Sequence, residues 1–342
     1  MIRRITRFAV LAASVTTPLC AQQINITGAG STFAAPLYQA WASQYVKLHP
    51  GTQINYQSIG SGGGIRQVST GTVDFGGTDT PMTDKLLNNA RNTLHTDILH
   101  FPVALGAVVP IHNIPGVNTQ LNFTAAALAG IYLGTITRWN DPEIARANPG
   151  INLPAKDIAI AHRSDASGTT FIWLDFLAKV SPAWRDRGPA PTINWPVGFG
   201  GKGNEGVAGF VRQTPYSIGY VELVYAVQTK MAYGQVQNAA GKFIKADLAS
   251  VTAAATSAAN TMPADFRVSI ANAPGPTAYP ISSFTWMLLP RDAKDRNKAA
   301  ILKTFLTWGL TEGQKFAPGL SYAPLSKPVV DKELAAIKTL HY

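Results

Sequence analysis

Residues 27–33 read TGAGSTF, and this segment decides the fold that we predict. A short strand-like run at 24–27 leads into it, and an apolar stripe at helical spacing follows it. Glycine lets a ligand approach the backbone, Ser and Thr offer hydroxyl donors, and a helix start offers unpaired N–H groups. The segment therefore predicts a strand–turn–helix unit suited to binding an anion. The apolar stripe consists of Leu37, Trp41, Tyr45 and Leu48.

Two later segments repeat this pattern. Residues 60–64 read GSGGG, follow a predicted strand at 54–59 and open a short helix at 65–69. Residues 165–170 read DASGTT and follow a predicted strand at 158–161. One such turn says little, because Ser and Thr cap helices in every kind of protein. Three in one chain favour a shared site where helix starts converge on an anion.

Strand-like and helix-like runs alternate along the chain, which is typical of α/β folds. A long apolar run at 98–111 predicts a strand that leaves one lobe, and the run at 281–289 predicts a strand that returns to it. We therefore predict lobe I at 22–104 and 282–342 and lobe II at 105–281. Each lobe is expected to be a β-sheet flanked by helices, with the ligand in a cleft that closes by a hinge motion.

The N-terminus predicts a secretory signal peptide at 1–21. Three arginines within the first seven residues precede an apolar run at 8–13, which is too short to span a bilayer. Its removal takes away three basic and no acidic residues, so the formal net charge falls from +10 to +7. The only cysteine, Cys20, lies before the cut, and the three residues in front of it do not resemble a lipoprotein sequence.

Several function classes lack their sequence patterns. The basic residues are scattered, which argues against nucleic acid but not against a small anion. The six histidines show no HxxH or HExxH spacing, and no GxSxG motif is present. Phe33 stands where a dinucleotide-binding turn needs its third glycine. We therefore predict a protein without cofactor or metal that is not an enzyme, although a catalytic group assembled from distant residues stays open.

Arg163 ends the strand before the third turn, and Asp165 follows two residues later. Residues two apart in an extended segment point to the same side, so these two can pair. The sequence leaves two interpretations equally open: Arg163 binds an anion, or it forms a structural ion pair. His162 points to the opposite face and is predicted to be a packing residue.

Asp79 lies in a loop after a predicted strand at 72–76. It could be a turn residue before Thr80 and Pro81, which is a common use of Asp. A carboxylate beside an anion site instead favours a ligand that carries a proton. Phosphate near neutral pH has such a proton, whereas sulfate only accepts hydrogen bonds. Asp79 would then attract phosphate and repel sulfate.

Six segments together resemble the periplasmic phosphate-binding proteins of phosphate-specific ABC importers. The resemblance covers nearly all of the predicted mature chain. The segments are TGAGSTFAAP (27–36), NYQSIGS (55–61), VDFGGTD (73–79), RSDASGT (163–169), WPVGFGGKGN (195–204) and IGYVE (218–222).

This resemblance implies the two-lobed periplasmic binding protein fold of type II, with one dehydrated phosphate in the cleft. It implies a set of phosphate-binding positions, of which Phe33 and Gly168 act through their backbone N–H groups. Those positions are Thr32, Phe33, Ser61, Asp79, Arg163, Ser167, Gly168 and Thr169. Asp165 matches the residue that pairs with the arginine. Ser31 and Thr78 replace small residues beside the site, and Ala166 replaces a glycine in a binding turn.

The resemblance also implies a function and partners. The expected protein is a periplasmic monomer that captures inorganic phosphate by hinge closure and delivers it to the permease and ATPase subunits of an ABC importer. Two alternatives share the cleft. One is a sulfate or molybdate receptor, whose site resembles a set of neutral donors without this Asp and Arg. The other is a secreted phosphatase.

Overall fold

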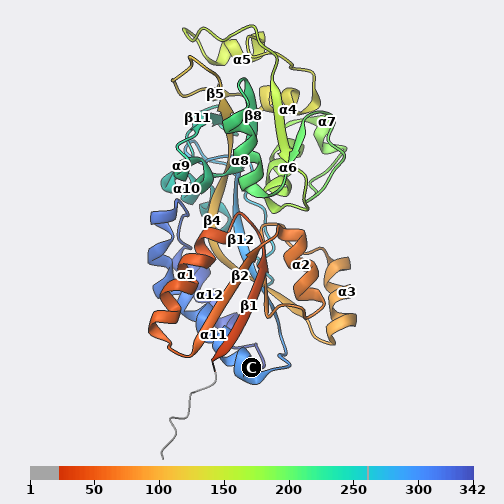
Figure 1. Cartoon of the computed structure of the whole chain (residues 1–342), viewed down its shortest axis with the longest axis vertical. Coiled ribbons are helices and arrows are strands. Elements are labelled where there is room, and N and C mark those ends of the chain that lie inside the picture. The colour runs from red at the N-terminus through yellow and green to blue at the C-terminus, as the bar shows by residue number, and fades with distance from the viewer. Residues whose placement is uncertain (1–22, 260–261) are drawn as a thin grey trace, which may run out of the picture.

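The computed structural model describes residues 23–259 and 262–342, so the predicted signal peptide lies outside the described residues. Figure 1 shows two lobes stacked along the longest axis of the molecule. We call the lower one lobe I and the upper one lobe II. Strands form the middle of each lobe and helices cover them, which confirms the predicted α/β fold with two lobes.

One mixed sheet of nine strands runs through both lobes in the order β2-β1-β3-β12-β4-β8-β6-β7, with β9 paired to β4. Its strands are β1 (Ile24–Gly30), β2 (Thr52–Ser58), β3 (Phe75–Thr78), β4 (Ile98–Asn113), β6 (Ala159–Arg163), β7 (Phe199–Gly201), β8 (Ser217–Glu222), β9 (Ala232–Tyr233) and β12 (Ser282–Pro290). A small sheet in lobe II joins β5 (Asn122–Phe123), β10 (Gln235–Gln237) and β11 (Phe243–Ile244).

Helices flank the sheet in both lobes. Figure 1 shows α2 and α3 on one side of lobe I and α1, α11 and α12 on the other. The helices of lobe I are α1 (Ala35–Leu48), α2 (Ser61–Ser69), α3 (Asp84–Leu94), α11 (Arg296–Leu310) and α12 (Lys327–Ile337), with 3₁₀ turns at Glu312–Phe316 and Pro318–Leu320. Those of lobe II are α4 (Ala125–Leu133), α5 (Pro142–Ala147), α6 (Gly168–Val180), α7 (Pro182–Arg185), α8 (Gly203–Gln213) and α9 (Leu223–Gln228), and α10 (Leu248–Ala259) lies near the junction.

Strand β4 connects the lobes. Its first part, up to Ala107, pairs antiparallel with β12, and its second part, from Val108, pairs antiparallel with β8. Almost every residue of β4 is buried, as the continuous apolar run predicted for a strand covered on both faces. Gly106 does not interrupt the strand. A β-carbon there would lie 2.4 Å from the Phe33 ring, so glycine lets that ring pack on the crossing strand.

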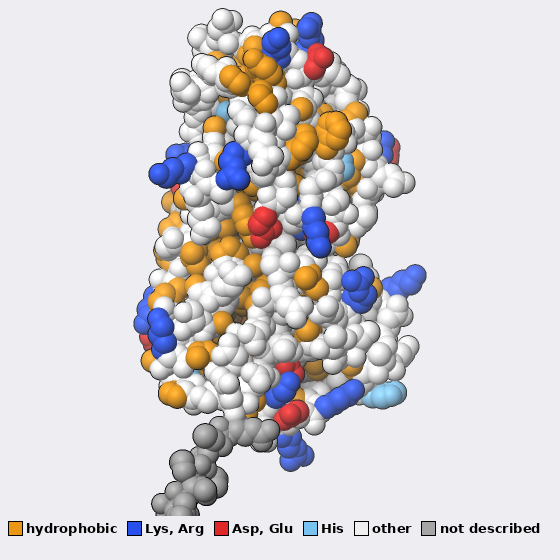
Figure 2. Space-filling view, viewed as in Figure 1, with side chains coloured by type: hydrophobic (Ala, Val, Ile, Leu, Met, Phe, Trp, Pro, Cys, Tyr) orange, Lys and Arg blue, Asp and Glu red, His pale blue; other side chains and the backbone are white. Residues whose placement is uncertain are grey.

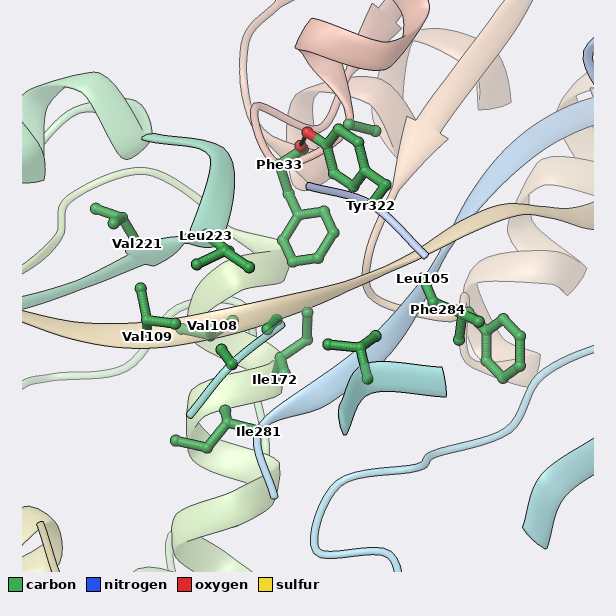
Figure 3. Packing of buried hydrophobic residues seen from close by; sticks show 14 of the residues in the cluster. Phe33, Leu105, Val108, Val109, Ile172, Val221, Leu223, Ile281, Phe284 and Tyr322 are labelled. Atoms are coloured by element: carbon green, nitrogen blue, oxygen red, sulfur yellow. Dashed lines mark hydrogen bonds between the residues drawn. The ribbon is translucent and has the colours of Figure 1, made fainter. Parts of the chain in front are cut away.

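Buried apolar side chains from both lobes form one core around β4. Figure 3 shows Phe33 beside Leu223 at this junction, and Ile281 on the other side of the strand. The hydroxyl of Tyr322 donates a hydrogen bond of 2.5 Å to the carbonyl of Phe33. Apolar side-chain packing therefore joins the lobes in addition to the connecting strand β4.

Three sequence predictions need correction in detail. Leu48 is the last residue of α1 and is 62% exposed, although the other three residues of the stripe are buried. Helix α2 begins at Ser61, not at residue 65, because the glycines fit helical backbone close to β1: a β-carbon on Gly64 would lie 2.6 Å from the Ala29 carbonyl. Strand β3 covers Phe75–Thr78 instead of 72–76, so it ends directly at Asp79.

Candidate functional site

Two strand ends and a helix start in lobe I carry the first half of the site. At the end of β1, a β-carbon on Gly30 would lie 2.0 Å from the Gly77 carbonyl, and the φ of Gly30 is 141°, so only glycine fits. The next residue, Ser31, donates its N–H to that same carbonyl. This fixes the turn before α1 against the end of β3. Ser61, the first residue of α2, donates to the Asp79 carboxylate over 3.2 Å.

The start of α6 supplies the second half from lobe II. A β-carbon on Gly168 would lie 2.4 Å from Asp79 Oδ2 and 2.5 Å from Ser61 Oγ, so the two lobes touch at this point. The N–H of Gly62 also donates across the junction to the Ala166 carbonyl over 3.0 Å. The structure therefore brings together the three turns that the sequence predicted to converge.

All eight residues of the predicted binding set are buried at this junction. They are Thr32, Phe33, Ser61, Asp79, Arg163, Ser167, Gly168 and Thr169. Residues of both lobes bury these eight positions. An anion held here loses its water, so it needs nearly complete hydrogen bonding from the protein.

Three hydroxyl groups donate to Asp79. Ser31 Oγ lies 2.6 and 2.7 Å from its two oxygens, Thr285 Oγ1 lies 2.7 Å from Oδ1, and Ser61 is the third donor. Burial raises the pKa of Asp79 to about 6, although the three hydroxyl bonds and the charge of Arg163 work to lower it. Asp79 is thus a carboxylate at neutral pH, but one that takes up a proton more readily than an exposed Asp.

Arg163 is held by Asp165 through two parallel hydrogen bonds. Its Nε lies 2.7 Å from Oδ1 and its Nη2 lies 2.5 Å from Oδ2, while Nη1 donates to Thr169 Oγ1 over 3.2 Å. Burial works to raise the pKa of Asp165, but the hydrogen bonds and the charge of Arg163 outweigh it and lower the pKa below its usual value. The ion pair aims the remaining nitrogen of the guanidinium at the start of α6.

Comparison with known proteins gives the family. The model of the PBP superfamily domain matches residues 14–312. The phosphate-binding protein PstS of Pasteurella multocida (strain Pm70) is 42% identical over 323 residues, which cover 94% of this chain and 92% of that protein. The PstS of Xylella fastidiosa (strain Temecula1) is 44% identical, with 93% and 87% covered. This chain belongs to the PBP superfamily, in the PstS family.

Solved structures agree with the fold of the PstS family. The crystal structure of a phosphate-binding protein from Stenotrophomonas maltophilia covers 91% of this chain and 93% of its own, with a TM-score of 0.69 and 20% identity. A high-affinity periplasmic phosphate-binding protein solved with bound phosphate gives a TM-score of 0.72 at 19% identity, with 91% and 93% covered. Both comparisons confirm the predicted periplasmic binding protein fold.

The structure adds side chains that sequence reasoning missed in this member of the PstS family. Asn204 donates through Nδ2 to Thr32 Oγ1 over 2.8 Å and to Thr169 Oγ1 over 3.2 Å, so it bridges the lobes. Tyr225 donates its hydroxyl to the Thr32 carbonyl over 2.6 Å. Thr285 reaches Asp79 from β12. Asn204 could have been found, because strand β7, a glycine turn and the start of α8 repeat the pattern of the other three turns.

The remaining features concern other kinds of site: His162, metal ligands, membrane-spanning helices and surface charge. His162 stacks on Trp195, with ring centroids 4.9 Å apart and an interplanar angle of 16°, in keeping with a packing role. Within residues 23–259 and 262–342, no group of three or more His, Cys, Asp or Glu is placed to hold a metal ion. None of the described helices is long and apolar enough to cross a membrane. Figure 2 shows the charged side chains scattered over one face, with no large basic patch on it.

Proposed function

We propose that this protein captures inorganic phosphate between its lobes by hinge closure and delivers it to an ABC importer. The observation that carries the proposal is the meeting of one buried carboxylate, Asp79, and one buried guanidinium, Arg163, at three helix starts. A cation and N–H groups attract an anion, and a carboxylate accepts a hydrogen bond from a proton that the anion carries. Among tetrahedral oxyanions this combination suits phosphate.

The proposed ligand set is the predicted one. Hydroxyl groups come from Thr32, Ser61, Ser167 and Thr169, and N–H groups from Phe33 and Gly168. Arg163 supplies the charge, with Asp165 as its positioning partner. Charge-assisted hydrogen bonds are the strong ones, so these groups together replace the water that the buried anion gives up. No covalent step is needed, and we propose no enzymatic activity and no cofactor.

Closure is proposed to couple binding to transport. The lobes at 22–104 with 282–342 and at 105–281 would rotate about the two crossing strands, and the interlobe bonds of Asn204 and Tyr225 form only when the lobes meet. Phosphate shifts the equilibrium toward the closed form, which the permease and ATPase subunits of the importer would recognise. Export through the signal peptide at 1–21 would place the protein in the periplasm, where we propose that it acts as a monomer.

A tryptophan-fluorescence titration of the mature protein tests this proposal. The seven tryptophans would report closure, and we expect saturable changes with phosphate and arsenate but none with sulfate near pH 8. A comparable response to sulfate or molybdate would assign a different oxyanion to the site. Release of phosphate from a chromogenic ester that persists through extensive purification would instead identify an enzyme.

A further inference from the structure

Ser31 is a fully buried donor to Asp79 that the proposed ligand set does not include. Its hydroxyl accepts the N–H of Ala34 over 3.1 Å, so its own proton is left to point at Asp79. Ser31 Oγ lies almost equally far from the two carboxylate oxygens of Asp79, at 2.6 Å from Oδ1 and 2.7 Å from Oδ2. A hydrogen bond from the Ser31 hydroxyl stabilises the charged form of Asp79 more than its protonated form, so it lowers the pKa of Asp79.

The backbone holds Ser31 in this position from both sides. Its N–H donates to the Gly77 carbonyl over 2.8 Å, and its carbonyl accepts the hydroxyl of Tyr56 over 3.0 Å. Ser31 and Asp79 both belong to lobe I, so their hydrogen bond persists when the lobes separate. Arg163 belongs to lobe II and moves away on opening, which leaves the hydroxyl bonds to hold the charge of Asp79 in the open form.

Few ionisable groups surround Asp79 among the described residues. Arg163 faces it from β6 and is shared with Asp165, and Glu222 faces it from the end of β8. Three buried tyrosines complete the surroundings, namely Tyr38, Tyr56 and Tyr322. Burial raises the pKa of Glu222 and of these tyrosines well above their usual values, which favours the neutral form of all four. Besides Arg163, the hydroxyl groups are what stabilises a charged Asp79.

We infer that Ser31 is a specificity-determining residue that keeps Asp79 ionised, so that the site goes on rejecting proton-free oxyanions in mildly acidic surroundings. The inference rests on the proposed function of the site. Once Asp79 is protonated it becomes a donor, and sulfate then meets a hydrogen bond in place of a charge. Sulfate binding should therefore increase as the pH falls and Asp79 takes up a proton.

Loss of the Ser31 hydroxyl favours the protonated form of Asp79, so the pKa of Asp79 moves up. The pH at which sulfate begins to bind moves up with it. A hydrogen bond to a charged group is worth enough to shift that pH by about 1–2 units. Phosphate binding near pH 8, where Asp79 is ionised in the wild type and at least about half ionised in the variant, should change by less than about tenfold.

The experiment compares sulfate and phosphate binding by calorimetry from about pH 4.5 to about pH 8. It uses the mature wild-type chain and the variant Ser31→Ala. Ser283→Ala is the matched control, because the buried hydroxyl of Ser283 donates to the Phe284 carbonyl and not to Asp79. We expect the onset of sulfate binding to move up by about 1–2 pH units in Ser31→Ala and to stay at the wild-type pH in the control.

One result would contradict the role of Ser31, and another would contradict the proposed function. If Ser31→Ala binds phosphate near pH 8 but begins to bind sulfate at the wild-type pH, the role of Ser31 is wrong while the proposed function stands. If the wild-type protein binds no phosphate at any pH, the proposed function itself fails. Should Ser31→Ala not fold, Ser31→Gly removes the same hydroxyl, and an unshifted onset in that variant contradicts the inference equally.

Discussion

Asp79 combines full burial, three hydroxyl donors and a pKa raised to about 6. A carboxylate of this kind can distinguish an oxyanion that carries a proton from one that does not. While it is charged, it accepts a hydrogen bond from the first and repels the second. The proposed discrimination depends on one charge, so one substitution should remove it.

The variant Asp79→Asn should lose most of the bias against sulfate near pH 8. Its amide is neutral and can donate as well as accept, so sulfate no longer meets a like charge. Calorimetry with both anions measures the ratio of the two affinities. Asp331→Asn serves as the control, because Asp331 pairs with Lys327 on the surface of α12, away from the site. An unchanged ratio in Asp79→Asn would contradict the proposed role.

Arg163 is the residue whose role the sequence left open between ligand and structural ion pair. If it binds the anion, Arg163→Ala should weaken phosphate binding by about 1.5–3 kcal/mol or more, the range for hydrogen bonds to charged groups. Arg91→Ala removes an exposed arginine that pairs with Asp97 and should leave binding unchanged. Wild-type affinity in Arg163→Ala would leave only the ion pair with Asp165 as its role.

At the scale of single residues, the sequence identified Arg163 and Asp165 as a possible ion pair. It did not reveal every hydrogen-bond partner of Asp79. Asp165 lies two residues from Arg163, so strand geometry indicated that the two could pair. Thr285 lies 206 positions from Asp79 in the sequence, in a strand whose apolar pattern gives no hint of a site. Such a contact depends on which strands become neighbours, and the pairing of β12 with β3 decides it.

Among the elements, α6 illustrates how a helix start serves both the fold and the site. Ser167 caps the helix by accepting the N–H of Thr170 over 3.1 Å, the ordinary use of Ser at this position. The next residue, Gly168, has no side chain, and this lets the helix start approach Asp79 and Ser61 across the junction. The cap is local to the helix, but the approach of the helix to the other lobe depends on one missing β-carbon.

The variant Gly168→Ala should fold normally but close poorly. Alanine favours a helix over glycine, so α6 is not weakened, whereas the new β-carbon would lie 2.4 Å from Asp79 Oδ2 in the closed form. We expect phosphate affinity to fall at least tenfold, about 1.4 kcal/mol, with an unchanged melting temperature without ligand. Gly209→Ala in α8 is the control, because a β-carbon there meets nothing within 4 Å. Wild-type affinity in Gly168→Ala would show that the lobes need not approach this closely.

Helix and strand existence followed from local patterns, but several boundaries did not. The prediction placed three glycines before α2, because glycine is a poor helix former. In the structure they belong to the helix, since they allow it to lie against β1 and β3. Close packing against a neighbouring element overrode local propensity, and the neighbour is not visible in the local sequence.

For the molecule as a whole, the two lobes are joined by β4 and β12 and by hydrogen bonds that exist only where the lobes meet. In the proposed hinge closure the lobes would rotate about these strands, and β4 pairs with β12 in its first part and with β8 in its second. The hydrogen bonds from Asn204 and Tyr225 to Thr32 join the two lobes, so they stabilise only the closed form. Under the proposed closure, part of the affinity for an anion comes from groups that need not touch it.

The variant Tyr225→Phe should weaken phosphate binding by about 0.5–1.5 kcal/mol, the net value of an ordinary hydrogen bond, mainly through faster release. Stopped-flow fluorescence measures the release rate. The control is Tyr132→Phe, because the buried hydroxyl of Tyr132 donates to the Ala161 carbonyl within lobe II. We expect that control to lower stability without changing release. Equal release rates in Tyr225→Phe and wild type would show that this interlobe bond does not stabilise the closed form.

The sequence by itself determined the α/β pattern, the two crossing strands and three turns rich in Gly, Ser and Thr, of which TGAGSTF is the first. These features depend on residues close together in the chain, whose spacing and backbone preferences act locally. Only the tertiary structure decided that the turns meet across the two lobes. It also placed Ser31, Thr285 and Asn204 around the charged pair and buried Asp79 deeply enough to raise its pKa. Burial and long-range contacts arise when distant segments pack together, so no local pattern can specify them.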